Sequence, residues 1–96
     1  PQKPINLTAT AVNNSAVLRW EGSHENITGY KIYYGTKSGI YNNADNIPII
    51  VGNQTEYVIN GLRNGEIYYF TITAIGGEGG NIESAFAEEV FVRTSY

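Results

Sequence analysis

The chain has 96 residues, a net charge of −3 and no cysteine. This length predicts one domain, near the small end of the range in which a chain can form its own core. Only six Lys and Arg residues occur, spread along the chain, which argues against nucleic-acid binding because that function needs a basic surface. The absence of cysteine excludes disulfides, thiolate metal sites and cysteine nucleophiles. No apolar run reaches the roughly 18 residues that a membrane span requires, so we expect no membrane insertion.

Seven short stretches alternate apolar with polar residues and are separated by turn-forming residues, a pattern typical of β-strands. In the clearest one, a turn at residues 63–65 leads into a segment that ends at Ala74. We expect one face of this strand to be buried, and the other, with Tyr69, Thr71 and Thr73, to point to water. The predicted strands are 4–11, 16–20, 29–35, 47–51, 55–60, the segment from the turn at 63–65 to residue 74, and 85–94.

The same alternation predicts which side chains form the core. Trp20 is the only tryptophan, and we expect it at the centre, between two sheets. The residues expected to point inward are Leu18, Trp20, Tyr30, Ile32, Tyr34, Ile59, Leu62, Tyr68, Phe70, Ile72, Val90 and Val92. Seven strands without a helical period predict an all-β, immunoglobulin-like antiparallel sandwich of two sheets.

Four features in this order resemble a fibronectin type III domain, and the resemblance covers essentially the whole chain. They are Pro4 with Leu7 and Ala9, the sequence Leu18-Arg19-Trp20, the sequence Gly29-Tyr30-Lys31-Ile32-Tyr33-Tyr34, and Gly61-Leu62 followed by Tyr68, Phe70, Ile72 and Ala74. The resemblance implies one module over residues 1–96, with strands A, B and E in one sheet and C′, C, F and G in the other. It also implies a tyrosine corner, in which the Tyr68 hydroxyl bonds to the backbone of the preceding turn.

Two details qualify what this resemblance implies. Asn64 stands where the family usually has proline, and we expect its side chain to form the turn, giving a looser corner. Residues 30–41 look most similar to modules of secreted bacterial polysaccharide-degrading enzymes, which space or support a catalytic domain elsewhere in the chain. We therefore expect an extracellular or cell-surface location and a module excised from a larger protein, monomeric when isolated. Arg-Gly-Asp is absent from the loop at 76–80, so integrin binding of that kind is not implied.

Side chains suited to catalysis or metal binding are sparse. His24, the only histidine, lies between Glu21 and Glu25, but this spacing is not a pattern of metal ligands. Asp45 is the only aspartate, too few for a calcium site built on converging carboxylates. The loop 76–80 lacks the lysine and following helix of a phosphate-binding loop, and we interpret it as a hairpin connection. We therefore expect no catalytic residue, no metal and no cofactor, although the parent chain could be a glycoside hydrolase.

Aromatic residues are the sharper surface feature. By alternation Tyr33, Tyr69 and Phe91 point outward on strands C, F and G, which are neighbours in the family order. Three interpretations stay open: cross-strand pairing that only stabilises the sheet, packing against a neighbouring domain, and contact with a polysaccharide or another protein.

Two functions follow from these features. The first is a non-catalytic spacer and interaction module of a secreted or surface multidomain protein, in particular a carbohydrate-active enzyme, with neighbouring domains of the same chain as partners. The alternative is an adhesion or ligand-binding module that uses the outer C-F-G face or the loops at 21–28, 36–46 and 76–80.

Overall fold

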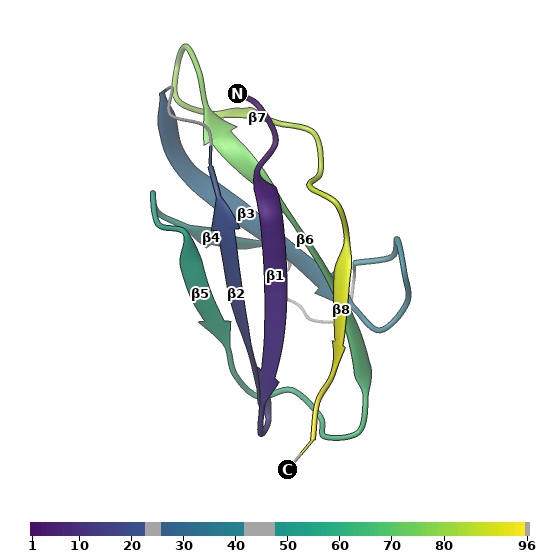
Figure 1. Ribbon diagram of the computed structural model, residues 1–96. Helices are drawn as coiled ribbons and strands as arrows, with labels where there is room; N and C mark the ends of the chain where they lie inside the picture. The colour runs from purple at the N-terminus through teal and green to yellow at the C-terminus, as the bar shows by residue number, and fades with distance from the viewer. Residues whose placement is uncertain (23–25, 42–47, 96) are drawn as a thin grey trace.

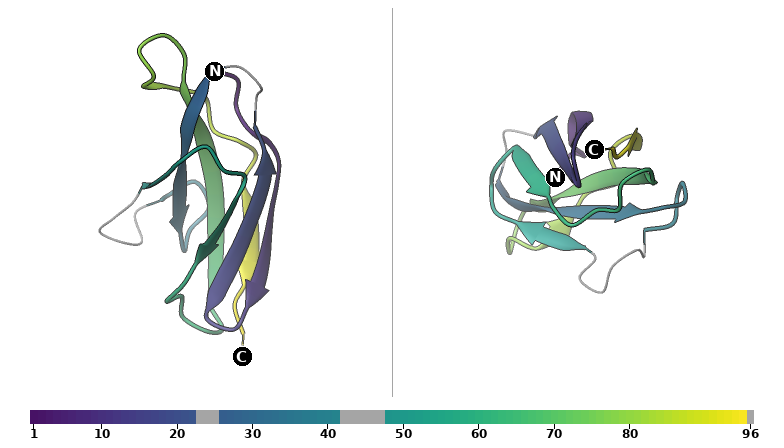
Figure 2. Two further views of the ribbon diagram at one scale, coloured as in Figure 1. Left: turned by 90° about the vertical axis from the view of Figure 1, so that its left-hand side faces the viewer. Right: turned by 90° about the horizontal axis from the view of Figure 1, so that it is seen from below.

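The computed structural model describes residues 1–22, 26–41 and 48–95 (Figures 1 and 2). These residues form eight strands and no helix. The strands are β1 (Ile5–Val12), β2 (Ser15–Glu21), β3 (Ile27–Gly35), β4 (Ile49–Val51), β5 (Glu56–Ile59), β6 (Ile67–Gly76), β7 (Ile82–Glu83) and β8 (Val90–Arg93). One sheet has the order β1-β2-β5, and the other has the order β4-β3-β6-β7 with β8 also paired to β6. Every pairing is antiparallel, so the predicted two-sheet sandwich is confirmed.

The predicted last strand, 85–94, is shortened to Val90–Arg93 in the structure, and the eighth strand of the described residues, β7 (Ile82–Glu83), lies before the predicted range. β7 and β8 both pair with β6, but residues 84–89 between them belong to neither strand. Ser84 Oγ accepts the hydrogen bond of the Ala74 N–H (2.9 Å), a donor that a strand neighbour would otherwise use. Only the N–H groups of Ser84 and Ala87 bond back to β6, at 2.8 and 2.9 Å. Side-chain bonding therefore replaces the regular ladder here.

The core lies between the two sheets and is rich in aromatic side chains. Trp20 meets the edge of Tyr30, with ring centroids 5.4 Å apart, and Tyr34 stacks on Phe70 at 5.7 Å. Burying one such side chain stabilises the fold by about 1.5–3 kcal/mol. The buried residues include Leu18, Trp20, Tyr30, Ile32, Tyr34, Ile59, Leu62, Tyr68, Phe70 and Ile72. Val90 and Val92 also face this core but are only partly buried, because β8 pairs on one side only.

The second face of β6 is also buried, contrary to the sequence-based expectation that it points to water. Thr71 and Thr73 are 0% and 1% exposed. The Thr71 hydroxyl donates to the carbonyl of Ala87 (2.8 Å), and the Thr73 hydroxyl donates to the carboxylate of Glu83 (2.7 Å). The segment after β7 therefore covers this face, which alternation along β6 alone could not indicate.

The strand expected at 29–35 begins two residues earlier, because Ile27 and Thr28 already belong to β3. Its register with β6 shifts between Ile27 and Gly29. Beside this irregularity, a Cβ atom on Gly76 would lie 1.9 Å from the carbonyl oxygen of Asn26. Only glycine permits that approach of two backbones.

The turn before β6 differs from expectation in one respect. Tyr68 does bond to its backbone, as the tyrosine corner requires. The side chain of Asn64, however, does not form the turn: its Nδ2 and Oδ1 atoms are buried without a hydrogen-bond partner in the described residues. Gly65 has a φ of +79°, so the left-handed conformation that this turn needs is supplied by glycine.

The module is elongated, with extents of 42 × 21 × 19 Å. Figures 1 and 2 show the N-terminal end and the C-terminal end of the described residues at opposite ends of the long axis. The turn between β1 and β2 lies at the C-terminal end, and the loop between β6 and β7 lies at the N-terminal end.

Candidate functional site

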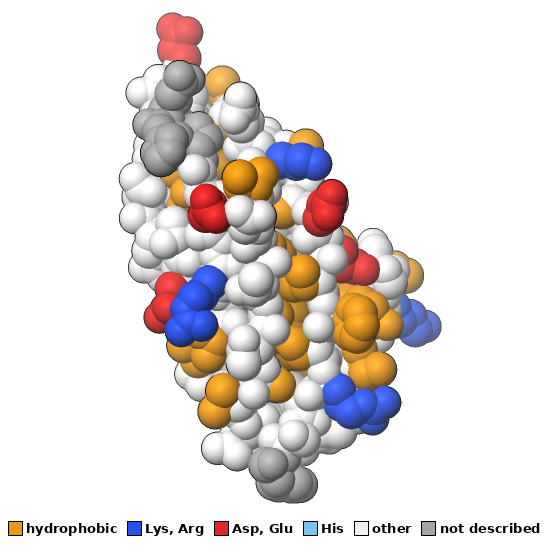
Figure 3. Space-filling view, in the orientation of Figure 1, with side chains coloured by type: hydrophobic (Ala, Val, Ile, Leu, Met, Phe, Trp, Pro, Cys, Tyr) orange, Lys and Arg blue, Asp and Glu red, His pale blue; other side chains and the backbone are white. Residues whose placement is uncertain are grey.

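The outer face of the larger sheet carries the three aromatic residues singled out from the sequence, but in two places. Tyr69 on β6 lies directly opposite Phe91 on β8, and their rings are 5.9 Å apart and tilted by 44°. Phe91 is 65% exposed, the most exposed aromatic ring among the large hydrophobic side chains of the described residues. Figure 3 shows hydrophobic side chains gathered over β8. We call Tyr69 and Phe91 the β6–β8 aromatic pair.

Tyr33 belongs to a different cluster on the same face. It lies opposite Thr71, two residues along β6 from Tyr69. Its ring contacts Phe86 at 5.1 Å and Tyr41 at 6.3 Å, and the rings of Tyr41 and Phe86 are 5.8 Å apart. The structure therefore brings two of the three predicted residues together and places the third in a separate cluster of Tyr33, Tyr41 and Phe86.

Phe86 and Tyr41 were missed by sequence reasoning. Counted back from Val90 along an unbroken strand, Phe86 would point inward, but the interruption at 84–89 turns it outward, where it is 50% exposed. Tyr41 follows a turn in which the Ile40 N–H bonds to the Lys37 carbonyl (3.1 Å). The neighbouring Ser84 and Glu88-Glu89, unusual in a strand, were the available signals for the interruption.

Glu83 fixes the hydroxyl of Tyr33. Its carboxylate accepts hydrogen bonds from the hydroxyls of Tyr33 and Thr73 and lies 3.5 Å from the Lys31 ammonium. Burial raises the pKa of Glu83, but the bonds from Tyr33 and Thr73 and the charge of Lys31 outweigh it, so that the pKa lies below its usual value. Burial, together with the hydrogen bond to Glu83 and its charge, raises the pKa of Tyr33 to about 12. The hydrogen bond between them therefore keeps the Glu83 carboxylate ionised and the Tyr33 phenol protonated at neutral pH.

Glu89 plays the same part for the loop after β3. Its carboxylate accepts hydrogen bonds from the Ser38 hydroxyl, the Gly39 N–H (2.8 Å) and the Tyr41 hydroxyl (2.6 Å). Burial raises the pKa of Glu89, but these three donors together lower it below its usual value. Burial and the contact with Glu89 raise the pKa of Tyr41. Because both carboxylates are committed to structural bonds, neither is poised as a general acid or base at neutral pH.

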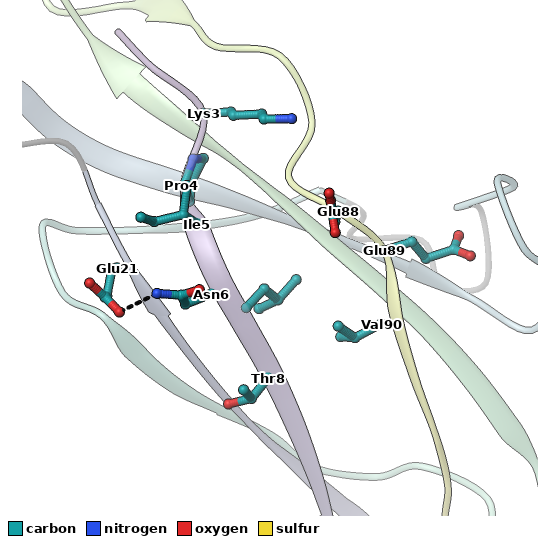
Figure 4. Close-up of a pocket in the computed structure, with 10 residues that line it drawn as sticks. Lys3, Pro4, Ile5, Asn6, Thr8, Glu21, Glu88, Glu89 and Val90 are labelled. Atoms are coloured by element: carbon teal, nitrogen blue, oxygen red, sulfur yellow. Dashed lines mark hydrogen bonds between the residues drawn. The ribbon is translucent and has the colours of Figure 1, made fainter.

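A groove of about 910 Å³ runs between β1 and the residues that lead into β8 (Figure 4). Its walls include Pro4, Leu7 and Val90. Glu21 accepts a hydrogen bond from the Asn6 amide (2.6 Å). Figure 4 shows Glu89 pointing away from β1, toward the loop that it binds. The acidic groups around the groove therefore do not converge on a common point, as a pair of catalytic carboxylates must.

The described residues contain no group of three or more potential metal-ligating side chains. Of the residues weighed for metal binding, Glu21 is described, while His24, Glu25 and Asp45 lie outside the described residues.

The loop 76–80 joins β6 to β7, which pair with each other as a hairpin does. No helix in the described part of the chain is long and apolar enough to cross a membrane.

These features define a class of protein: a two-sheet β-sandwich module whose acidic side chains hold the fold and whose exposed feature is an aromatic surface. The sequence profile of the fibronectin type III domain matches residues 1–90. The chain belongs to the fibronectin type III family, whose members are generally non-catalytic modules. A Kelch domain-containing protein of Saccharolobus solfataricus is 35% identical over 80 residues, which cover 82% of this chain. The chain spans about 10% of the length of that relative.

Solved structures agree with this fold at low sequence identity. An Fn3-like protein from Clostridium thermocellum superposes with a TM-score of 0.81 at 23% identity, covering 100% of this chain and 95% of the other. The FN5 domain of Drosophila Lar gives 0.77 at 22%, covering 100% and 98%. A β-1,2-glucanase from Parabacteroides distasonis gives 0.80 at 22%, covering 99% of this chain but 13% of its own. In that last protein the fold is one part of a larger chain.

Proposed function

We propose that this chain is a non-catalytic spacer and interaction module of a secreted or cell-surface multidomain protein that acts on carbohydrate. The observation that carries the proposal is the position of the two ends at opposite poles of a body 42 Å long. Domains attached at these ends are held apart by the length of the module. The carboxylates of Glu83 and Glu89 are held in hydrogen bonds that support the fold.

Two similarities support the carbohydrate context. The segment from Tyr30 to Tyr41 resembles modules of secreted polysaccharide-degrading enzymes. The fold is also found within the chain of a β-1,2-glucanase, where it matches 13% of the length. Neighbouring domains of the same chain are the first partners that we propose for this module.

The test is made in the full parent chain, with labels on the domains that flank this module. Duplicating the module should lengthen the distance between the flanking domains by roughly its own long extent, 42 Å. Replacing it by a Gly/Ser segment of equal residue number should leave a broad distance distribution, because such a segment is a flexible coil. A distance that does not change on duplication would show that the flanking domains fold back on each other and that the module is not a spacer.

A second function is favoured by the exposed β6–β8 aromatic pair. Phe91 remains 65% exposed although its ring packs against Tyr69, so most of the ring surface is accessible to a ligand. We propose as the alternative that this face binds a carbohydrate or another protein. Replacing Phe91 by serine should abolish such binding and leave the distance between flanking domains unchanged.

A further inference from the structure

Two positively charged residues, Arg93 on β8 and Lys37 in the loop after β3, lie near the β6–β8 aromatic pair. Phe91 and Arg93 alternate onto the outer face of β8, so Arg93 lies two residues along the strand from Phe91. The Arg93 guanidinium donates one hydrogen bond, from Nη1 to the Gly65 carbonyl (3.1 Å). A guanidinium has five N–H donors, so Arg93 is anchored and still has donors available for a ligand.

Lys37 lies in the loop that follows β3, where it bridges to Ile40. It directly precedes Ser38 and Gly39, which both bond to Glu89. The loop continues over the end of β3, where a Cβ atom on Gly35 would lie 2.3 Å from the Ile40 carbonyl oxygen. Gly35 is the β3 residue opposite Tyr69. The turn that carries Lys37 is therefore fixed beside the aromatic pair.

Neither of these cations forms an ion pair with another described residue. Within the described residues, the ion pairs are Arg19 with Glu56 and Lys31 with Glu83. Among the described residues, the strand and loop positions next to the aromatic pair bring two cations, Lys37 and Arg93, and one carboxylate, Glu89, so they give this patch excess positive charge in a chain of net charge −3. Figure 3 shows blue side chains below and beside the hydrophobic patch over β8.

The second aromatic cluster differs in its charge. Tyr33 and Tyr41 both donate their hydroxyls to carboxylates, those of Glu83 and Glu89. The nearby Lys31 is already paired with Glu83. This cluster therefore exposes a ring, Phe86, without an available cation, and it serves as an internal comparison for the β6–β8 aromatic pair.

We propose that the β6–β8 aromatic pair, with Lys37 and Arg93, binds an acidic polysaccharide that contains uronic acid. One pyranose face would stack on the Phe91 ring, as apolar sugar C–H groups pack on aromatic faces. The carboxylate of that sugar or its neighbour would bond to the Arg93 guanidinium, which suits a carboxylate in shape and charge. This inference rests on the binding function proposed above as the alternative, and it specifies the ligand.

The size of the patch favours a sugar chain over a protein. A stable protein interface covers about 800 Å² on each partner, with roughly 20–30 residues. The patch has one largely exposed ring, one partly exposed ring and two cations, which matches one or two sugar units instead. Neutral glucans would use the ring but neither cation, so they should bind less tightly than polygalacturonate.

The experiment is affinity electrophoresis of the full chain in native gels that contain polygalacturonate, with a gel of neutral β-glucan beside it. We expect retardation by polygalacturonate that weakens as salt is added, because salt screens exposed charges. Phe91→Ser, Arg93→Ser and Lys37→Ser should each weaken binding, with about a tenfold increase in Kd for Phe91→Ser or Arg93→Ser, equivalent to about 1.4 kcal/mol. Phe86→Ser, which removes a similarly exposed ring, should leave binding unchanged.

Each other outcome overturns a stated part. No retardation in polygalacturonate, or equal loss with Phe86→Ser, would refute the site. Equal retardation by neutral glucan, lost in Phe91→Ser but not in Arg93→Ser, would retain the binding function and refute the acidic ligand. Equal binding of polyglutamate would show attraction of any polyanion, not recognition of a sugar. Circular dichroism checks that each variant is folded. If Phe91→Ser does not fold, Lys37→Ser still tests the site, because the exposed Lys37 side chain makes no hydrogen bond in the described residues.

Discussion

The hydroxyl of Tyr68 accepts a 2.9 Å hydrogen bond from the backbone N–H of Arg63. Tyr68 is 2% exposed, so this bond satisfies its buried hydroxyl and a donor of the turn together. The same turn is tied to the end of the chain, because the Gly65 N–H bonds to the Thr94 carbonyl (2.6 Å). Tyr68 therefore holds the turn before β6, and the Gly65–Thr94 bond links that turn to the residue that follows β8.

Tyr68→Phe should destabilise the domain by about 1–2 kcal/mol, because it leaves the Arg63 N–H without its partner. Urea unfolding measures the change as a lower midpoint with an unchanged slope. Tyr69→Phe is the control, since the Tyr69 hydroxyl makes no hydrogen bond in the described residues, and it should change stability by less than about 0.5 kcal/mol. Equal midpoints for Tyr68→Phe and the unaltered chain would show that the corner bond does not stabilise the fold.

Asn64→Pro should stabilise the domain by about 1 kcal/mol, unlike most substitutions in a turn. Asn64 precedes Gly65, whose φ of +79° marks the third position of a type II turn, and proline is favoured at the second position. The change also removes the buried amide atoms that have no partner in the described residues. The measurement is the unfolding midpoint in urea.

Asn64→Ala separates the two contributions to this effect. It removes the amide but not the backbone freedom, so it should recover only part of the stabilisation. A lower midpoint for Asn64→Pro than for Asn64→Ala would mean that the turn cannot accept the proline ring.

Sequence alternation was sufficient for the core because each strand that faces another sheet must bury one side. Trp20, Tyr30 and Phe70 are placed correctly by this rule alone. It fails at residues 84–89, where the hydroxyl of Ser84 takes a hydrogen bond that a strand would make. An alternating pattern does not reveal such a side-chain bond, so the outward position of Phe86 was not predictable from it.

The candidate site was predictable in part for a related reason. Strands F and G of the family, which are β6 and β8 here, are neighbours, so the contact of Tyr69 with Phe91 followed from the strand order. Tyr33 is offset because it lies opposite Thr71, while Gly35 lies opposite Tyr69. The register between strands depends on the turns and bulges that join them. The alternation of apolar and polar residues does not fix this register to within two residues.

Thr71→Val should destabilise the domain by about 1–2 kcal/mol although it keeps the shape of the side chain. The buried Thr71 hydroxyl donates to the Ala87 carbonyl at 2.8 Å, and valine leaves that carbonyl unpaired. Hydrogen exchange should show faster opening at the Ala87 N–H, which bonds to Ile72. Thr10→Val, at an exposed position of β1, is the matched control. Comparable losses in the two variants would contradict a special role for the covering segment.

The domain should lose stability as the pH falls through the acidic range, and Glu83 and Glu89 should account for part of this loss. The folded state lowers the pKa of both carboxyls, so unfolding between their folded and ordinary pKa values takes up protons. Their contribution is therefore complete above the ordinary pKa and disappears as the pH falls through the folded value. Urea midpoints measured from about pH 7 to pH 3 should fall less steeply in the double variant Glu83→Gln, Glu89→Gln. The double variant Tyr33→Phe, Tyr41→Phe keeps both carboxylates but removes one hydrogen-bond donor from each, so its urea midpoint should fall with pH at an intermediate slope. An unchanged slope in the double glutamine variant would show that other groups cause the acid sensitivity.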